Sequence, residues 1–337
     1  MIDRRGERLD SATTTFTVFT ATYNRAATLP RVFTSLTQQD FRDFEWLIVD
    51  DGSTDGTADL VRSWQRSAEF PIHYIYKPNG GKHTAWNVGL DNAKGRFFLS
   101  LDSDDACTPD ALRVFIDSWE SIEPDRRGEF TGVCALVKDA NGTVIGDRFP
   151  SDVFDSDSSA LRFQHHIAGE KWGFHRTDVV REFRFPEEEG VRYVPESVVW
   201  GRIAAKYQER FINRALRIYF YDADVRLSTP SWKDPRPFVL GTRAALNEQA
   251  RRWFVHDPVF FCKAAANFAR NSWLTGVGAV EQSRQLKGWS GRSLWAFMLP
   301  VGWLLYRSDA RRRNRFQSET NEYSRSLPSH ALGPSEP

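Results

Sequence analysis

Residues 97–105 read Phe-Phe-Leu-Ser-Leu-Asp-Ser-Asp-Asp, an apolar run followed at once by carboxylates. Three earlier apolar runs, residues 16–20, 44–49 and 72–76, end in the same way, in Thr22-Tyr23-Asn24, Asp50-Asp51-Gly52-Ser53 and Asn79-Gly80-Gly81-Lys82. Apolar runs of this length, bounded by turn residues, predict buried β-strands. In an open parallel α/β sheet, ligands bind at the carboxyl ends of the strands. The four runs therefore predict one binding crevice along one edge of a sheet.

Helical patterns lie between and after these runs. Apolar residues recur at helical spacing over residues 29–36, 57–64, 84–93 and 109–119,. Thr108-Pro109 offers a hydroxyl and a proline in the order that commonly starts a helix,. Alternating strands and helices with short connections predict a parallel sheet with right-handed crossovers. The predicted fold class is therefore α/β.

The pattern changes after about residue 121. We expect a hairpin around Asn141-Gly142, a polar loop over residues 151–159, a helix over residues 196–207 and a late strand over residues 216–221,. Residues 229–237 have the composition of a linker, and helical stretches follow. Four parts are predicted: a flexible N-terminus (1–14), an α/β domain (15–228), a helical C-terminal extension (229–317) and a disordered tail (318–337).

Composition excludes several classes of protein. The formal net charge is +1, which gives no reason to expect nucleic acid as a partner,. Cys107, Cys134 and Cys262 lie far apart, which argues against a disulfide framework or a zinc site,. The first residues lack the apolar core of a secretory signal, and no apolar run reaches the roughly 18–20 residues that span a bilayer. We therefore expect a cytoplasmic location.

Asp102 and Asp104 are the sharpest candidates for a site. Two carboxylates two residues apart at a strand end can share one divalent cation, directly or through a bound ligand. Hard oxygen ligands suit Mg²⁺ or Mn²⁺, which complete their shells with water and substrate phosphates. The alternative is that these aspartates only end a strand and cap the next helix. Their place in the predicted crevice favours the metal.

Two neighbouring strand ends suit a nucleotide. Asp51 can accept a hydrogen bond from the N–H of a base such as uracil, although Asp-Gly is also a common turn. Residues 79–83 form a glycine-rich turn before a helix, where backbone N–H groups and Lys82 can approach a diphosphate,. The spacing differs from that of a P-loop. Residues 22–25 carry no glycine, which argues against a dinucleotide-binding fingerprint,.

Five segments together resemble the family 2 glycosyltransferases, which have the GT-A fold: residues 20–24, 49–57, 79–82, 86–89 and 101–105. The resemblance is strong over about residues 14–120, thinner to about residue 222 and absent beyond. It implies a mostly parallel central sheet and a nucleotide-diphosphate-sugar donor, with a UDP-sugar favoured. It also implies a metal-dependent, inverting transfer to a hydroxyl of a glycan or lipid-linked acceptor.

The resemblance also implies roles for single residues. Asp51 matches the residue that holds the base, Asp102 the residue near the ribose, and Asp104 the metal ligand. The expected donor site is completed by Ala21, Tyr23, Lys82 and Ser103. Glu196 stands at the place of the family's catalytic base and is the expected base here. Ser197 stands where the family usually has an aspartate, so Asp178 and Glu187–Glu189 stay open as alternatives.

Two other functions stay open. A non-catalytic relative that binds sugar nucleotides would keep Asp51 and Asp104 but lack a working base, and the departure at Ser197 allows this. A sugar nucleotidyltransferase can share the architecture. It usually carries a glycine- and arginine-rich loop after the first strand, which residues 22–28 lack.

Residues 294–306 form an almost wholly apolar run, followed by five arginines between residues 307 and 315. Pro300 should break or kink a helix there. The tryptophans and the tyrosine of the run suit a membrane–water interface, and the arginines should attract anionic lipid. We expect peripheral association with the inner face of the cell membrane. The alternative is a buried helix with a solvated basic end.

Overall fold

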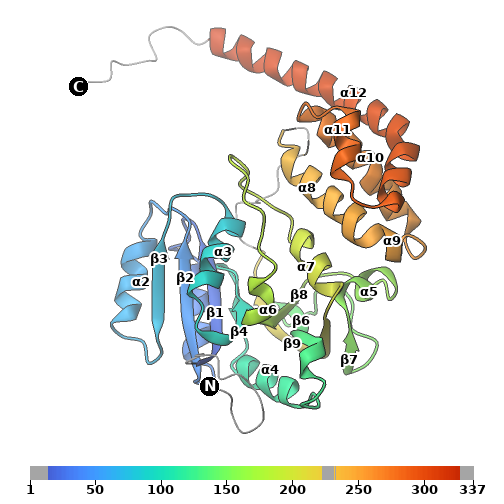
Figure 1. Ribbon diagram of the computed structural model, residues 1–337. Coiled ribbons are helices and arrows are strands. Elements are labelled where there is room, and N and C mark those ends of the chain that lie inside the picture. The colour runs from blue at the N-terminus through green and yellow to red at the C-terminus, as the bar shows by residue number, and fades with distance from the viewer. Residues whose placement is uncertain (1–13, 222–230, 232, 327–337) are drawn as a thin grey trace. The chain divides into compact units, whose positions relative to one another are not determined.

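The computed structural model describes residues 14–221, 231 and 233–326. The chain forms two compact units, Met1–Leu227 and Ser228–Pro337, and each is described here by itself (Figure 1). Nearly all of the predicted flexible N-terminus, the start of the predicted linker and the end of the predicted tail lie outside the described residues.

The first unit is built on one sheet with helices packed against it (Figure 1). Its first four strands are β1 (Thr14–Thr22), β2 (Phe44–Asp50), β3 (Ile72–Tyr76) and β4 (Gly95–Ser100). They lie in the order β3-β2-β1-β4, and every neighbouring pair is parallel. The four predicted strands therefore end at one edge of the sheet, and the α/β class is confirmed.

The other half of the sheet is mixed. It contains β5 (Ala106–Cys107), β6 (Phe130–Asp139), β7 (Val153–Ser156), β8 (Lys171–Arg176) and β9 (Gln208–Tyr219). β8 runs antiparallel between β4 and β6, and β6 pairs in parallel with β9. β9 pairs with β5, β6 and β7, and its Arg217 reaches Asp102, which follows β4.

The helices of this unit alternate with the strands. They are α1 (Leu29–Thr37), α2 (Thr57–Gln65), α3 (Lys82–Asn92), α4 (Ala111–Glu120), α5 (Ser158–Phe163), α6 (Thr177–Arg181) and α7 (Ser197–Ala204), with a 3₁₀ turn at Arg127–Glu129. Leu29, Val32 and Leu36 show why α1 forms, because their spacing puts all three on the buried face,. These residues join a core of large aromatic side chains under the sheet.

Three local predictions need correction. α4 begins at Ala111, two residues later than predicted, and the Thr108 hydroxyl donates to the Asp110 carboxylate at 2.6 Å and does not cap the helix. The predicted hairpin is reduced to one bridge, between Lys138 and Val144. The predicted polar loop over residues 151–159 contains β7 and the start of α5, which Asp157 caps. Asp and Ser populate loops and helix caps alike, so composition did not separate the two.

The second unit is helical. It contains α8 (Arg236–Ala244), a π turn at Ala245–Gln249, α9 (Ala250–Trp253), α10 (Pro258–Leu274), α11 (Ala279–Gln285) and α12 (Trp289–Ser326). α10 packs on α12, and Gly302 permits the close approach. A Cβ atom on Gly302 would lie 2.8 Å from the Ala266 carbonyl oxygen. Phe268 and Trp295 are buried in this core.

α12 continues through Pro300, so the helix does not break there, and it also includes residues 318–326 of the predicted disordered tail. Ala296 and Pro300 are both exposed, and water can therefore satisfy the carbonyl that the missing proline N–H leaves free,.

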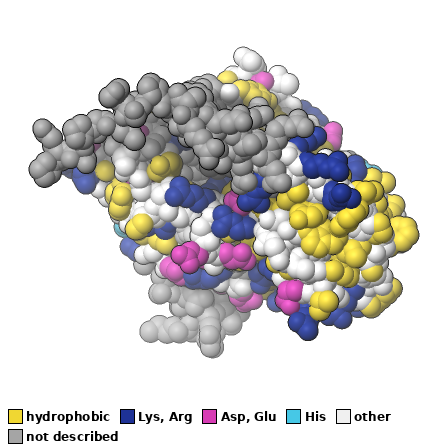
Figure 2. All heavy atoms as spheres, turned by 90° about the horizontal axis from the view of Figure 1, so that it is seen from above, with side chains coloured by type: hydrophobic (Ala, Val, Ile, Leu, Met, Phe, Trp, Pro, Cys, Tyr) yellow, Lys and Arg dark blue, Asp and Glu magenta, His cyan; other side chains and the backbone are white. Residues whose placement is uncertain are grey.

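Figure 2 shows hydrophobic side chains gathered on one face of the molecule, with Lys and Arg side chains beside them. None of the helices within the described ranges is long and apolar enough to cross a membrane.

Candidate active site

Asp51 anchors the glycine-rich turn between β3 and α3. Its Oδ1 accepts hydrogen bonds from Lys77 Nζ at 2.6 Å and from the Gly80 N–H at 2.9 Å, and its Oδ2 accepts from the Gly81 N–H at 2.7 Å. Gly81 has a φ of +97°, and a Cβ there would lie 2.1 Å from the Arg192 carbonyl oxygen. A carboxylate has about four acceptor positions. One position of Asp51 is therefore left for another donor.

The other predicted donor residues follow the neighbouring strands. Ala21 is near the end of β1, and Tyr23 follows that strand with a side chain that is 48% exposed. Ser103 is buried, and its carbonyl oxygen accepts from the Thr28 hydroxyl at 3.0 Å. The Asp51 N–H donates to the carbonyl oxygen of Thr22, which ties the ends of β1 and β2 together. The structure thus brings these residues to one edge of the sheet.

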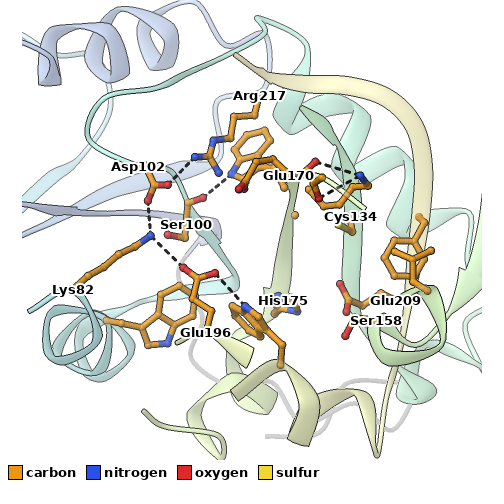
Figure 3. Close-up of a pocket in the computed structure, with 18 residues that line it drawn as sticks. Lys82, Ser100, Asp102, Cys134, Ser158, Glu170, His175, Glu196, Glu209 and Arg217 are labelled. Atoms are coloured by element: carbon orange, nitrogen blue, oxygen red, sulfur yellow. Dashed lines mark hydrogen bonds and ion pairs between the residues drawn. The ribbon is translucent and has the colours of Figure 1, made fainter. Parts of the chain in front are cut away.

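Asp102 lies between two cations (Figure 3). Its Oδ1 is 2.8 Å from Lys82 Nζ, and its Oδ2 is 2.7 Å from Arg217 Nη2. Burial acts to raise the pKa of Asp102, but these two charges outweigh it and hold the pKa well below its usual range,. Burial likewise acts to lower the pKa of Lys82, and the neighbouring carboxylates raise it above its usual range. The Lys82–Asp102 pair is therefore fully charged at neutral pH.

Arg217 is a site residue that the sequence analysis missed. It comes from β9, is 7% exposed, and also donates from Nε to Asp105 Oδ2 at 2.6 Å. Burial raises the pKa of Asp105 to about 6. The only signal in the sequence was an arginine between Leu216 and Ile218, within a run (residues 216–221) that is otherwise apolar or aromatic. Its partners lie more than a hundred residues earlier, so no local pattern could reveal them.

Asp104 is only loosely paired. Arg25 Nη2 lies 3.8 Å from its Oδ2, and the side chain is 23% exposed. No group of three or more His, Cys, Asp or Glu side chains in the described part of the chain could hold a metal ion. Mg²⁺ is commonly held by one or two carboxylates together with substrate phosphates. The residues therefore fit an ion shared by Asp104 and a diphosphate, and they do not fit a cage made by the protein alone.

Glu196 lies immediately before α7 and reaches back to Lys82. Lys82 Nζ is 3.3 Å from Glu196 Oε1, and Trp200 Nε1 donates to Oε2 at 3.3 Å. The Glu196 side chain is 55% exposed. One ammonium group thus joins Asp102, which follows the fourth strand, to the carboxylate predicted as the base. The two residues lie 94 positions apart in the sequence (196 minus 102).

The alternative bases lie elsewhere. Asp178 pairs with Arg176, and Glu187 accepts from Asn87 Nδ2 at 2.7 Å. Neither these two carboxylates nor Glu188 and Glu189 line the cavity beside Lys82, whereas Glu196 does. Placement in the structure therefore favours Glu196.

A cavity of about 350 Å³ opens beside the Lys82 ion pairs (Figure 3). Besides the charged residues, its lining includes Trp86, Trp172, His175 and Trp200. Trp172 is fixed by a hydrogen bond from Nε1 to the Ser100 carbonyl oxygen at 2.6 Å. Burial lowers the pKa of His175 to about 4, so its imidazole is neutral. The volume lies within the range of small-molecule sites, and the aromatic lining is typical of them.

The comparisons with known proteins point to one family of enzymes. Residues 17–126, which contain the four parallel strands, match the model of glycosyl transferase family 2. The GalNAc(5)-diNAcBac-PP-undecaprenol beta-1,3-glucosyltransferase of Campylobacter jejuni is 29% identical over 212 residues, 60% of this chain and 63% of that protein. The putative teichuronic acid biosynthesis glycosyltransferase TuaG of Bacillus subtilis is 34% identical over 133 residues, 39% of this chain and 50% of that protein. The chain covers less than two thirds of each relative.

Solved structures show the same fold. Staphylococcus aureus TarS 1–349 in complex with UDP-GlcNAc aligns with a TM-score of 0.56 at 20% identity, over 86% of this chain and 80% of that one. Its complex with UDP aligns with a TM-score of 0.55 at 19% identity, over 87% and 91%. At these identities the likeness concerns the fold. The chain therefore has the GT-A fold of these structures, and its residues 17–126 are similar to glycosyltransferase family 2.

Proposed function

We propose that this protein transfers a sugar from a nucleotide-diphosphate donor to a hydroxyl of a glycan or lipid-linked acceptor, with inversion at the sugar carbon. One observation carries the proposal. Lys82 lies within 3.3 Å of both Asp102 and Glu196, so a cation for the leaving diphosphate and a carboxylate for the attacking hydroxyl meet at one cavity.

The donor is proposed to be a UDP-sugar. The Asp51 carboxylate suits the N–H of uracil, and Lys82, the first residue of α3 after the turn that Asp51 holds, suits the diphosphate,. TarS, which shares the fold, was solved with UDP-GlcNAc. Ala21, Tyr23 and Ser103 would complete the nucleotide site at the same edge of the sheet.

The transfer itself needs one proton acceptor and one stabilised leaving group. The acceptor oxygen attacks the sugar carbon, the bond from that carbon to the diphosphate breaks in line, and Glu196 takes the hydroxyl proton. Lys82 offsets the negative charge that develops on the diphosphate. Mg²⁺ or Mn²⁺ at Asp104, when bound, would supply Lewis-acid stabilisation of the same phosphates.

The acceptor class rests on the relatives. The name of the Campylobacter jejuni protein includes an undecaprenol-linked glycan, and the name of TuaG refers to teichuronic acid biosynthesis. A role in the synthesis of a surface polysaccharide fits both names.

The outer face of α12 supports work at a membrane surface. Phe297, Val301 and Leu304 repeat at helical spacing and are 75%, 42% and 63% exposed. The Arg307 guanidinium lies over the Trp303 ring, 4.7 Å from the ring centroid. An exposed apolar stripe that ends in arginines suits the headgroup region of anionic lipid. We therefore propose peripheral association with the inner face of the cell membrane.

A UDP-release assay tests the function. Purified protein with UDP-sugars and Mg²⁺ or Mn²⁺ should release UDP, and Glu196→Gln should lower the rate roughly 10²–10⁴-fold. Calorimetry should show unchanged UDP binding in that variant, and Asp178→Asn should keep its activity. UDP-sugar binding without turnover would favour the non-catalytic relative. Pyrophosphate release from UTP would instead indicate a nucleotidyltransferase.

A further inference from the structure

The Glu209 side chain is a buried carboxyl. It lies in β9, is 8% exposed and lines the cavity. No hydrogen bond or ion pair reaches its carboxyl group from any other residue in the described ranges. Burial raises the pKa of Glu209 to about 7, and the nearby Asp157 adds to the shift. A buried carboxyl in this situation lowers stability, so its position calls for a role.

The Glu209 side chain lines one side of the cavity. Figure 3 shows Glu209 and Ser158 on the side of the cavity opposite Asp102 and Lys82. His175 lies between the two sides and stacks on Trp200, with ring centroids 4.8 Å apart. Flat apolar walls with a few polar groups are typical of sites that orient a small ligand. The space therefore suits a ring that is apolar on its faces and polar at its edge.

The charges around the cavity argue against an anionic ligand at Glu209. Lys171 donates from Nζ to the Ala168 carbonyl oxygen at 2.9 Å, and Arg217 is engaged by Asp102 and Asp105. A phosphate or carboxylate bound there would therefore lie against the Glu209 carboxyl, and the two nearby cations, Lys171 and Arg217, already have partners. A neutral hydroxyl can donate to the ionised carboxyl and accept from the protonated one.

We propose that the part of the cavity around Glu209 is a subsite for one neutral sugar ring, and that Glu209 selects the ring by hydrogen bonding to one of its hydroxyls. This rests on the proposed function, because the ring belongs to the sugar of the donor or to the acceptor. The same cavity contains Glu196 and Asp102, so a ring held at Glu209 shares the space of the proposed reacting groups.

The test compares the wild type with Glu209→Leu, which removes the hydrogen bond, and Glu209→Gln, which can still form one. Glu69→Gln is the matched control, because Glu69 is exposed in the turn before β3. Calorimetry measures the affinity for UDP, for UDP-glucose and for UDP-GlcNAc. Tryptophan fluorescence of the UDP-saturated protein measures the affinity for neutral methyl glycosides.

We expect all four proteins to bind UDP equally, because Asp51 does not line the cavity. Glu209→Leu should bind sugar roughly tenfold or more weakly, and Glu209→Gln should recover most of that loss. A loss confined to the UDP-sugars assigns the ring to the donor, and a loss confined to the methyl glycosides assigns it to the acceptor. The unfolding midpoint of Glu209→Leu should equal or exceed that of the wild type.

Two results would overturn the subsite alone. The first is a sugar affinity of Glu209→Leu equal to that of the wild type. The second is a wild type that binds UDP but gains no affinity from the sugar of a UDP-sugar and does not bind methyl glycosides. A fall in the unfolding midpoint of Glu209→Leu together with weaker UDP binding would show a structural role and also overturn it. A wild type that fails to bind UDP would overturn the proposed function itself, which separates the two failures.

Discussion

Asp51 holds the Gly80–Gly81 turn through both of its carboxylate oxygens. We also propose that the same carboxylate accepts a hydrogen bond from the base. Asp51→Ala should therefore weaken UDP binding by about 1–3 kcal/mol, the loss typical of a charged hydrogen-bond partner. Calorimetry checks this, with Asp59→Ala on the exposed face of α2 as the control that keeps full affinity. Guanine nucleotides that bind far more tightly than UDP would contradict the choice of uracil.

The raised pKa of Glu209 has a consequence for stability. Burial lifts this pKa from 4.5 to about 7, with Asp157 adding to the effect; the Cys134 thiol is a further titratable neighbour, and burial raises its pKa well above its usual value. The folded protein thus binds the Glu209 proton more tightly than the unfolded chain. The stabilising contribution of Glu209 is complete below pH 4.5 and is lost as the pH rises to about 7,. Each pH unit in this window lowers the free energy of unfolding by roughly 1.4 kcal/mol. Urea unfolding from pH 5 to 8 should show a shallower decline in Glu209→Gln.

At this scale the sequence located the residues that follow strands. Asp51, Lys82 and Asp102 were predicted because a parallel sheet brings its strand ends together. Arg217, Trp200 and Glu209 were not, because each reaches the site from an element far along the chain. The Arg217–Asp102 pair spans 115 residues, and no spacing rule covers such a distance.

Among the elements, α12 has one buried and one exposed face. Trp295 and Gly302 face the core of the second unit, while Phe297, Val301 and Leu304 face outward. The sequence offered membrane contact and burial as alternatives for residues 294–306, and the helix buries one face and exposes the other. Periodicity predicted the first four strands and helices well. Periodicity did not predict α5, where Asp157 caps a helix within a polar stretch. It also did not predict that a helix continues through Pro300, which lies on a solvated face.

Substitutions on the two faces of α12 should have different effects, on liposome binding for the exposed face and on stability for the buried face. Phe297→Asp with Leu304→Asp should abolish cosedimentation with anionic liposomes and leave the unfolding midpoint unchanged, because both residues are exposed,. Trp295→Ala should instead cost about 3–5 kcal/mol of unfolding free energy. Val280→Asp on exposed α11 is the control for an added charge. Intact protein that stays in the supernatant at low salt would refute the membrane proposal.

In the whole molecule, the two units have separate cores. One contains the aromatic side chains under the sheet, and the other lies between α10, α11 and α12. Scanning calorimetry should therefore resolve two transitions. UDP at about a hundredfold excess over its Kd should stabilise the first unit alone by about 2.7 kcal/mol. A single transition that UDP shifts as a whole would contradict independent units.

The shared position of Lys82 sets an order of events. Its ammonium group holds Asp102 and Glu196 at once, and an arriving diphosphate competes for the same charge. We therefore expect Glu196 to be released from Lys82, and to become able to accept a proton, only when the nucleotide is in place. Initial-rate patterns should show compulsory addition with the donor first. Random addition would mean that Glu196 is free of Lys82 before any substrate arrives.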